Sequence, residues 1–200
     1  IWCERTRRIY WTDIEGSELL ALEEDSSVVM RWSLPERLGS FALTENSDVL
    51  LMGLASRFAF CDLNTGIFTP VVASPGGPGT RTGDGRCDRE GNFVFGTMDD
   101  GYPAKVIGRF HRLNAATLSI ETLPLPEVAI PNSICFSPDG STMYYCDSMQ
   151  GRIMCCDYPS MNNQRVFTVT EGKGAPDGSC VDAMGYIWNA EWGGSRVVRY

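Results

Sequence analysis

The sequence predicts an all-β protein of the β-propeller type, and three observations carry this prediction. First, five short segments share one apolar and aromatic pattern, at residues 9–13, 49–53, 93–97, 143–147 and 187–191. Second, subtraction shows that their first residues lie 40, 44, 50 and 44 positions apart, close to the length of a four-stranded propeller blade. Third, no helix of useful length interrupts the series.

A second strand-like segment follows four of the five repeats, at residues 19–22, 58–61, 152–156 and 196–200. Gly16, Gly151 and Gly194 supply turns between the paired strands. Residues 17–24 favour a helix by propensity alone, but the repeat places a strand there. In the third unit the second strand is delayed to residues 108–111, so that residues 99–107 form an insertion and a candidate site loop.

The bulk composition bounds the function. With 43% hydrophobic residues and no shift in composition along the chain, we expect one domain over residues 1–200. The formal net charge of −8 argues against a nucleic-acid partner, because it would repel a phosphate backbone. The most apolar window, residues 49–61, contains Ser56 and Arg57 and is too short to span a membrane.

The eight cysteines are expected to be reduced and mostly buried. Cys135, Cys146, Cys155 and Cys156 lie in apolar strand-like runs, where a free thiol behaves as a small hydrophobe. The N-terminus lacks the pattern of a secretory signal. Both observations favour a cytoplasmic location.

The candidate site follows from the repeat. In a propeller, loops that enter the innermost strands meet at one mouth of the central channel, so equivalent positions become neighbours. Asn132 lies eleven residues before Met143, Asp177 ten before Ile187, and Asp84 nine before Phe93. We expect Asn132 and Asp177 in small polar loops, where their oxygens suit a divalent cation. The alternative is that both residues cap turns.

The other polar residues have structural explanations. Asp48 and Asp139 are placed to form turns, and Asp13 and Asp147 to bond the backbone at strand ends. A Ser/His/Asp hydrolase would have to use His111, the single histidine, which lies outside the converging loops and is expected to be a packing or surface residue.

Four motifs, at residues 131–140, 176–182, 188–194 and 95–98, together resemble the gluconolactonase/regucalcin family, which includes senescence marker protein and luciferin-regenerating enzyme. The resemblance implies a six-bladed propeller, of which this chain would hold about four and a half blades, with the start of the first blade and the C-terminal blades outside it. It also implies one divalent metal ion, Ca, Zn, Mn or Mg, and a sugar lactone as substrate.

By the same resemblance, Asn132 and Asp177 are two of three protein ligands of the metal, and Asp177 is the catalytic base. The third ligand would be a glutamate just upstream of Ile1. The substrate loop corresponds to Arg81, Asp84 and an acidic residue after Met98, Asp99 or Asp100, of which we select Asp100. The family's asparagine is replaced by Gly83, which indicates a substrate different from the best-known one.

The predicted activity is metal-assisted opening of an aldonolactone, such as a gluconolactone, xylonolactone or arabinonolactone. Two other functions stay open. A non-enzymatic binding propeller is suggested by Tyr10-Trp11-Thr12-Asp13, which resembles the repeat of extracellular receptor propellers but occurs once. A metal-dependent esterase or phosphotriesterase of the same fold is the other.

Overall fold

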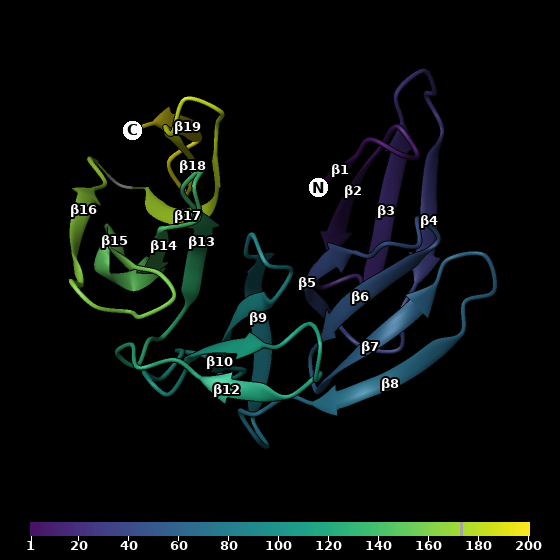
Figure 1. Cartoon of the computed structure of the whole chain (residues 1–200), viewed down its shortest axis with the longest axis horizontal. Helices are drawn as coiled ribbons and strands as arrows, with labels where there is room; N and C mark the ends of the chain where they lie inside the picture. The colour runs from purple at the N-terminus through teal and green to yellow at the C-terminus, as the bar shows by residue number, and fades with distance from the viewer. Residues whose placement is uncertain (173) are drawn as a thin grey trace.

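The computed structural model describes residues 1–172 and 174–200. These residues form nineteen strands and one short 3-10 helix. The strands make five antiparallel sheets in chain order, which Figure 1 shows as an arc with the N-terminal and C-terminal sheets at its two ends. The prediction of an all-β propeller is confirmed.

Each sheet is a meander of neighbouring strands. The first contains β1 (Trp2–Cys3), β2 (Arg8–Asp13), β3 (Glu18–Glu23) and β4 (Val29–Ser33). The second contains β5 (Leu38–Leu43), β6 (Val49–Leu54), β7 (Arg57–Asp62) and β8 (Phe68–Ala73). The third contains β9 (Thr80–Cys87), β10 (Phe93–Asp99), β11 (Phe110–Leu113) and β12 (Ile120–Thr122).

The fourth sheet contains β13 (Pro131–Phe136), β14 (Thr142–Asp147), β15 (Arg152–Asp157) and β16 (Arg165–Val169). The 3-10 helix η1 (Ser148–Gln150) connects β14 to β15. The fifth contains β17 (Ala175–Val181), β18 (Ile187–Trp192) and β19 (Arg196–Arg199).

The prediction of about four and a half blades is wrong, because the described residues form five sheets. The five repeats that revealed the propeller are the second strands of the sheets, not the innermost ones. The innermost strands are β5, β9, β13 and β17, which pack against one another from sheet to sheet around the axis. Counting from the second strand missed β17, which gives the last sheet three strands.

A β-bulge interrupts the innermost strand of the third, fourth and fifth sheets at the same level. In β13 the register shifts between Asn132 and Cys135, and in β17 between Pro176 and Ser179. In β9 the shift falls at Gly83 and Asp84, opposite the stretch of β10 that starts at Phe95. A bulge adds one residue to one strand and redirects its side chains, so each innermost strand bends at this level.

The hydrophobic core lies between neighbouring sheets, as the propeller architecture requires. Phe58 of the second sheet packs against Phe95 of the third, with ring centroids 4.5 Å apart. Phe93 lies 6.0 Å from Phe58 in an edge-to-face arrangement, and all three rings are fully buried or nearly so. Such aromatic contacts hold adjacent blades in a fixed relation.

One glycine sets the approach of the third sheet to the fourth. A Cβ at Gly96 of β10 would lie 2.3 Å from the ring of Pro131, a distance at which atoms overlap. Gly96 therefore allows β10 to pack directly onto the start of β13, where Asn132 follows Pro131. The sequence stretch Phe95-Gly96-Thr97 is thus part of the framework of the site.

The repeat correctly predicted that residues 18–23 form a strand despite their helical propensity. All eight cysteines are unpaired in the structure, and six of them are buried. Among the residues that the structure describes, no helix is long and apolar enough to cross a membrane.

We expect Phe58→Ala to destabilise the fold by about 3–5 kcal/mol, because it leaves a cavity between two blades. Ile67→Ala is the matched control, since Ile67 is 63% exposed, and should change stability by less than about 1 kcal/mol. Denaturant unfolding measures both values. Equal effects of the two substitutions would contradict the interblade core.

His111 is a packing residue, as the sequence analysis expected. It is buried, stacks on Phe95 at 5.2 Å, and its two ring nitrogens lie 3.2 Å from the hydroxyls of Thr97 and Thr122. Burial, with a smaller contribution from the charge of Arg109, lowers the pKa of His111 from 6.5 to about 4. The folded protein therefore holds this ring neutral.

This shift predicts a pH dependence of stability. Between pH 6.5 and about 4 the unfolded chain protonates His111 and the folded chain does not, so stability falls as the pH falls, by up to about 3 kcal/mol. His111→Gln should remove this part of the loss. Unfolding free energies of both proteins at pH 7 and pH 4.5 test it, and parallel pH curves would refute it.

Candidate active site

The structure brings Asn132, Asp177 and Asp84 together, but not in loops. Asn132 lies in β13, Asp177 in β17 and Asp84 in β9, so the expectation of loop positions is wrong. Each residue lies at the bulge of its strand, and each is partly exposed. A bulge and a loop favour the same small polar residues, so the sequence around these three residues looked like a loop.

Asn132 is linked to the strand of Asp177 through one serine. Its side-chain Nδ2 donates to Ser148 Oγ at 2.9 Å, and that hydroxyl donates to the carbonyl oxygen of Pro176 at 2.7 Å. Pro176 directly precedes Asp177. The chain of two hydrogen bonds therefore joins the Asn132 side chain to the residue before Asp177, across neighbouring blades.

Buried polar side chains form hydrogen bonds with the backbone of Asp177. Ser133 Oγ donates to the Asp177 carbonyl oxygen at 2.7 Å, and Asn189 Nδ2 lies 3.2 Å from the same oxygen. Asn189 also donates to Ser179 Oγ at 2.9 Å. Ser133 has a positive φ of 60°, which is costly for a side chain other than glycine, so its hydroxyl contact offsets local strain.

Asp84 is the third acidic or amide side chain at this level. Its Oδ2 accepts a hydrogen bond from the Ile134 amide at 2.9 Å, which ties β9 to the bulge of β13. Burial raises the pKa of Asp84, the Ile134 amide and Arg86 oppose this, and the charge of Asp177 adds to the rise. Burial likewise raises the pKa of Asp177.

Arg86 spans from the third blade to the fifth. Its Nη2 donates to the carbonyl oxygen of Ser179 at 2.8 Å, so the side chain passes β13 to reach β17. Arg86 and Ser179 each lie two residues beyond the predicted site residues Asp84 and Asp177, which places this contact about 6–7 Å further along the strands. Arg86 was not predicted from the sequence.

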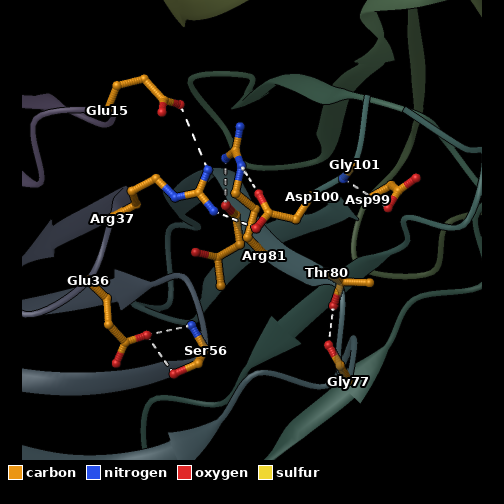
Figure 2. A network of polar contacts seen from close by, with 11 residues as sticks. Glu15, Glu36, Arg37, Ser56, Gly77, Thr80, Arg81, Asp99, Asp100 and Gly101 are labelled. Atoms are coloured by element: carbon orange, nitrogen blue, oxygen red, sulfur yellow. Dashed lines mark hydrogen bonds and ion pairs between the residues drawn. The ribbon is translucent and has the colours of Figure 1, made fainter. Parts of the chain in front are cut away.

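The predicted substrate residues Arg81 and Asp100 form a second polar group. Asp100 lies between two arginines, with Arg37 Nη2 2.5 Å from its Oδ2 and Arg81 Nε 3.6 Å from its Oδ1 (Figure 2). Glu15 lies 3.9 Å from Arg37. Arg81 is the second residue of β9, the strand that contains Asp84, so this group lies on the entry side of β9. The insertion that follows β10 supplies Asp100.

Arg37 was missed by the sequence analysis, although the repeat contains the signal. It lies 44 positions before Arg81, by subtraction, which equals the spacing between the second and third repeats. Asp99, the alternative to Asp100, instead accepts hydrogen bonds from the backbone of Gly101 and Lys105 and so shapes the loop.

The donor set fits a hard or borderline divalent cation. Asp177 supplies a carboxylate, and Asn132 supplies an amide oxygen because its nitrogen is occupied by Ser148. Within the two ranges that the structure covers, no three His, Cys, Asp or Glu side chains gather as a metal-binding group. Together, the two oxygen donors, the half-buried carboxylate of Asp84 and nearby arginines can bind a polar neutral molecule and activate water beside it.

Three of the four aspartates set aside in the sequence analysis have structural roles. Asp147 accepts hydrogen bonds from the backbone amides of Ala129 and Ile130, and Asp13 from that of Gly16. Asp139 accepts from the Ser141 amide in the turn before β14.

Comparison with known proteins identifies the family of the chain. The profile of the SMP-30/gluconolactonase/LRE-like region matches residues 1–200. L-arabinolactonase of Azospirillum brasilense is 52% identical over 204 residues, which cover 100% of this chain and 68% of that protein. 6-Deoxy-6-sulfogluconolactonase of Pseudomonas putida is 28% identical, over 100% of this chain and 69% of that protein.

A solved structure shows the same arrangement. The crystal structure of regucalcin from Agrobacterium tumefaciens, described as a calcium-binding protein, superposes with a TM-score of 0.90 and 30% identity, over 100% of this chain and 68% of that one. The match thus extends through all five sheets and the strands that contain Asn132, Asp177 and Asp84. This chain belongs to the SMP-30/gluconolactonase/LRE-like family.

Proposed function

We propose that the protein is a sugar lactonase that depends on a divalent metal ion and opens an aldonolactone to the free sugar acid. The observation that carries the proposal is that Asn132 and Asp177 lie on neighbouring innermost strands, where Ser148 joins the Asn132 side chain to the carbonyl oxygen of Pro176, the residue before Asp177. The 52% identity to L-arabinolactonase supports a lactone of a five-carbon sugar acid as substrate.

In this proposal Asn132 and Asp177 hold the cation, together with a glutamate upstream of Ile1. A divalent cation bound there would supply Lewis acidity to the lactone carbonyl. Asp177 orients the attacking water and accepts its proton as the new C–O bond forms.

Arg81 completes the proposed chemistry. Asp100, which also pairs with Arg37, holds the Arg81 guanidinium at the entry side of β9. There Arg81 would donate to the lactone oxygens and stabilise the negative charge that develops during attack. The ring C–O bond then breaks, and the former ring oxygen takes up a proton to become a hydroxyl. We also propose that the complete protein closes into a ring of six blades.

Asp177→Asn should lower kcat for lactone hydrolysis by at least about 100-fold, because an amide cannot accept the proton of the water. A chelator should abolish the activity of the wild type, and added divalent metal should restore it. The measurement is hydrolysis of L-arabinonolactone by the purified full-length protein, in a panel that includes a phosphotriester.

Asp25→Asn is the control, because the Asp25 side chain is 89% exposed and forms only a surface ion pair with Arg7 at 3.7 Å. This variant should retain wild-type activity. Lactone hydrolysis that survives both the chelator and Asp177→Asn would end the proposal. Turnover of the phosphotriester in place of the lactone would assign a different substrate to the same site.

Gly83 determines substrate choice in this proposal. It lies in the bulge of β9 next to Asp84, and a Cβ there would meet its nearest neighbour, the Pro131 ring, at 3.5 Å, an ordinary contact. The backbone therefore tolerates a side chain at this position. Its absence leaves space and removes one hydrogen-bonding group from the substrate pocket.

We expect Gly83→Asn to raise kcat/KM for a six-carbon gluconolactone relative to a five-carbon arabinonolactone by about 2- to 10-fold, the value of one added hydrogen bond. Gly83→Ala adds the Cβ without the amide and should leave the ratio unchanged. Equal ratios in wild type and Gly83→Asn would show that this position does not set selectivity.

A further inference from the structure

An asparagine side chain binds a cation only when its oxygen, not its nitrogen, faces the ion. The two ends of the amide have nearly the same shape, so packing alone selects poorly between them. Asn132 is partly exposed in β13, and one end of its amide contacts Ser148. What fixes the direction of this amide is therefore a separate question from what holds the metal.

The direction of the Asn132 amide is fixed by Ser148, because a serine hydroxyl has only one proton to donate. Ser148 Oγ lies 2.7 Å from the carbonyl oxygen of Pro176, which can only accept a hydrogen bond. The single hydroxyl proton of Ser148 is thereby used, and toward Asn132 the oxygen can only accept. Asn132 must present Nδ2 to Ser148, at 2.9 Å, and its oxygen is left facing the other way.

Ser148 is itself held rigidly. It is buried at the start of η1, and its backbone amide donates to the Ile130 carbonyl oxygen at 2.9 Å. Asp147 caps η1 through the Met149 amide and also accepts from the amides of Ala129 and Ile130, just before β13. One buried carboxylate thus fixes both the serine and the entry of the strand that contains Asn132.

We propose that Ser148 is a positioning residue that turns the oxygen of the Asn132 amide toward the metal site and sets its place relative to Asp177. The inference rests on the proposed function, because it needs a cation at Asn132 and Asp177. Ser148 itself does not touch the metal or the substrate. It acts by donating to Pro176 and accepting from Asn132, which couples the fourth blade to the fifth.

The test is a double-mutant cycle in which the measured quantity is the affinity for a metal ion, with no enzymatic assay. Mn²⁺ is titrated into the purified full-length wild type, Ser148→Ala, Asn132→Ala and the double variant, by calorimetry or by the signal of free Mn²⁺ in electron spin resonance. Ser27→Ala, an exposed serine in the first blade, is the control. Circular dichroism and thermal unfolding establish that each variant is folded.

We expect Ser148→Ala to weaken Mn²⁺ binding about tenfold, as is typical when a partner of a metal ligand is lost, and Asn132→Ala at least as much. In the Asn132→Ala background, Ser148→Ala should change the affinity by less than about twofold, because the residue through which it acts is gone. Ser27→Ala should bind as the wild type does.

Two results would overturn the inference. If Ser148→Ala weakens binding equally in both backgrounds, it acts by general destabilisation and not through Asn132. If Ser148→Ala binds Mn²⁺ as tightly as the wild type, the amide needs no such partner. A wild type that binds no Mn²⁺ would overturn both this inference and the metal dependence of the proposed function, whereas the first two results leave the proposed function intact.

Discussion

The site depends on the contact between the innermost strands of neighbouring blades. The bulges in β9, β13 and β17 lie at one level, and hydrogen bonds cross from each to the next: Ile134 to the Asp84 carboxylate, and Ser133 to the Asp177 carbonyl oxygen. Because these strands belong to separate sheets, no backbone ladder joins them. Side-chain to backbone bonds therefore set the spacing of the polar residues.

The electrostatics of the site follow from the same arrangement. Asp84 and Asp177 are partly buried, and burial is the largest cause of the raised pKa of each. Two carboxylates near one another favour a cation between or beside them. Arg81 precedes and Arg86 follows Asp84 along β9, so positive side chains flank the two carboxylates. The negative charge of the site is therefore local, even though the whole chain is acidic.

The sequence predicted the fold well because each blade repeats one pattern of strands and turns. Similar offsets from the repeat, of eleven, ten and nine residues, located Asn132, Asp177 and Asp84. It misplaced these residues in loops, because a bulge and a loop both favour small polar residues and glycine, and hydrogen-bond register is not visible in residue types. It missed Arg37, although the 44-residue offset pointed to it. Ser148 could not be found, since its importance lies in which neighbour takes its proton.

Arg86 has a consequence for the rigidity of the site. Its side chain extends from β9 to the Ser179 carbonyl oxygen of β17, so the third and fifth blades are joined directly as well as through β13, which packs against both. A displacement of either blade would therefore break this hydrogen bond together with the contacts to β13. The three strands that contain Asp84, Asn132 and Asp177 thus brace one another as the sides of a triangle.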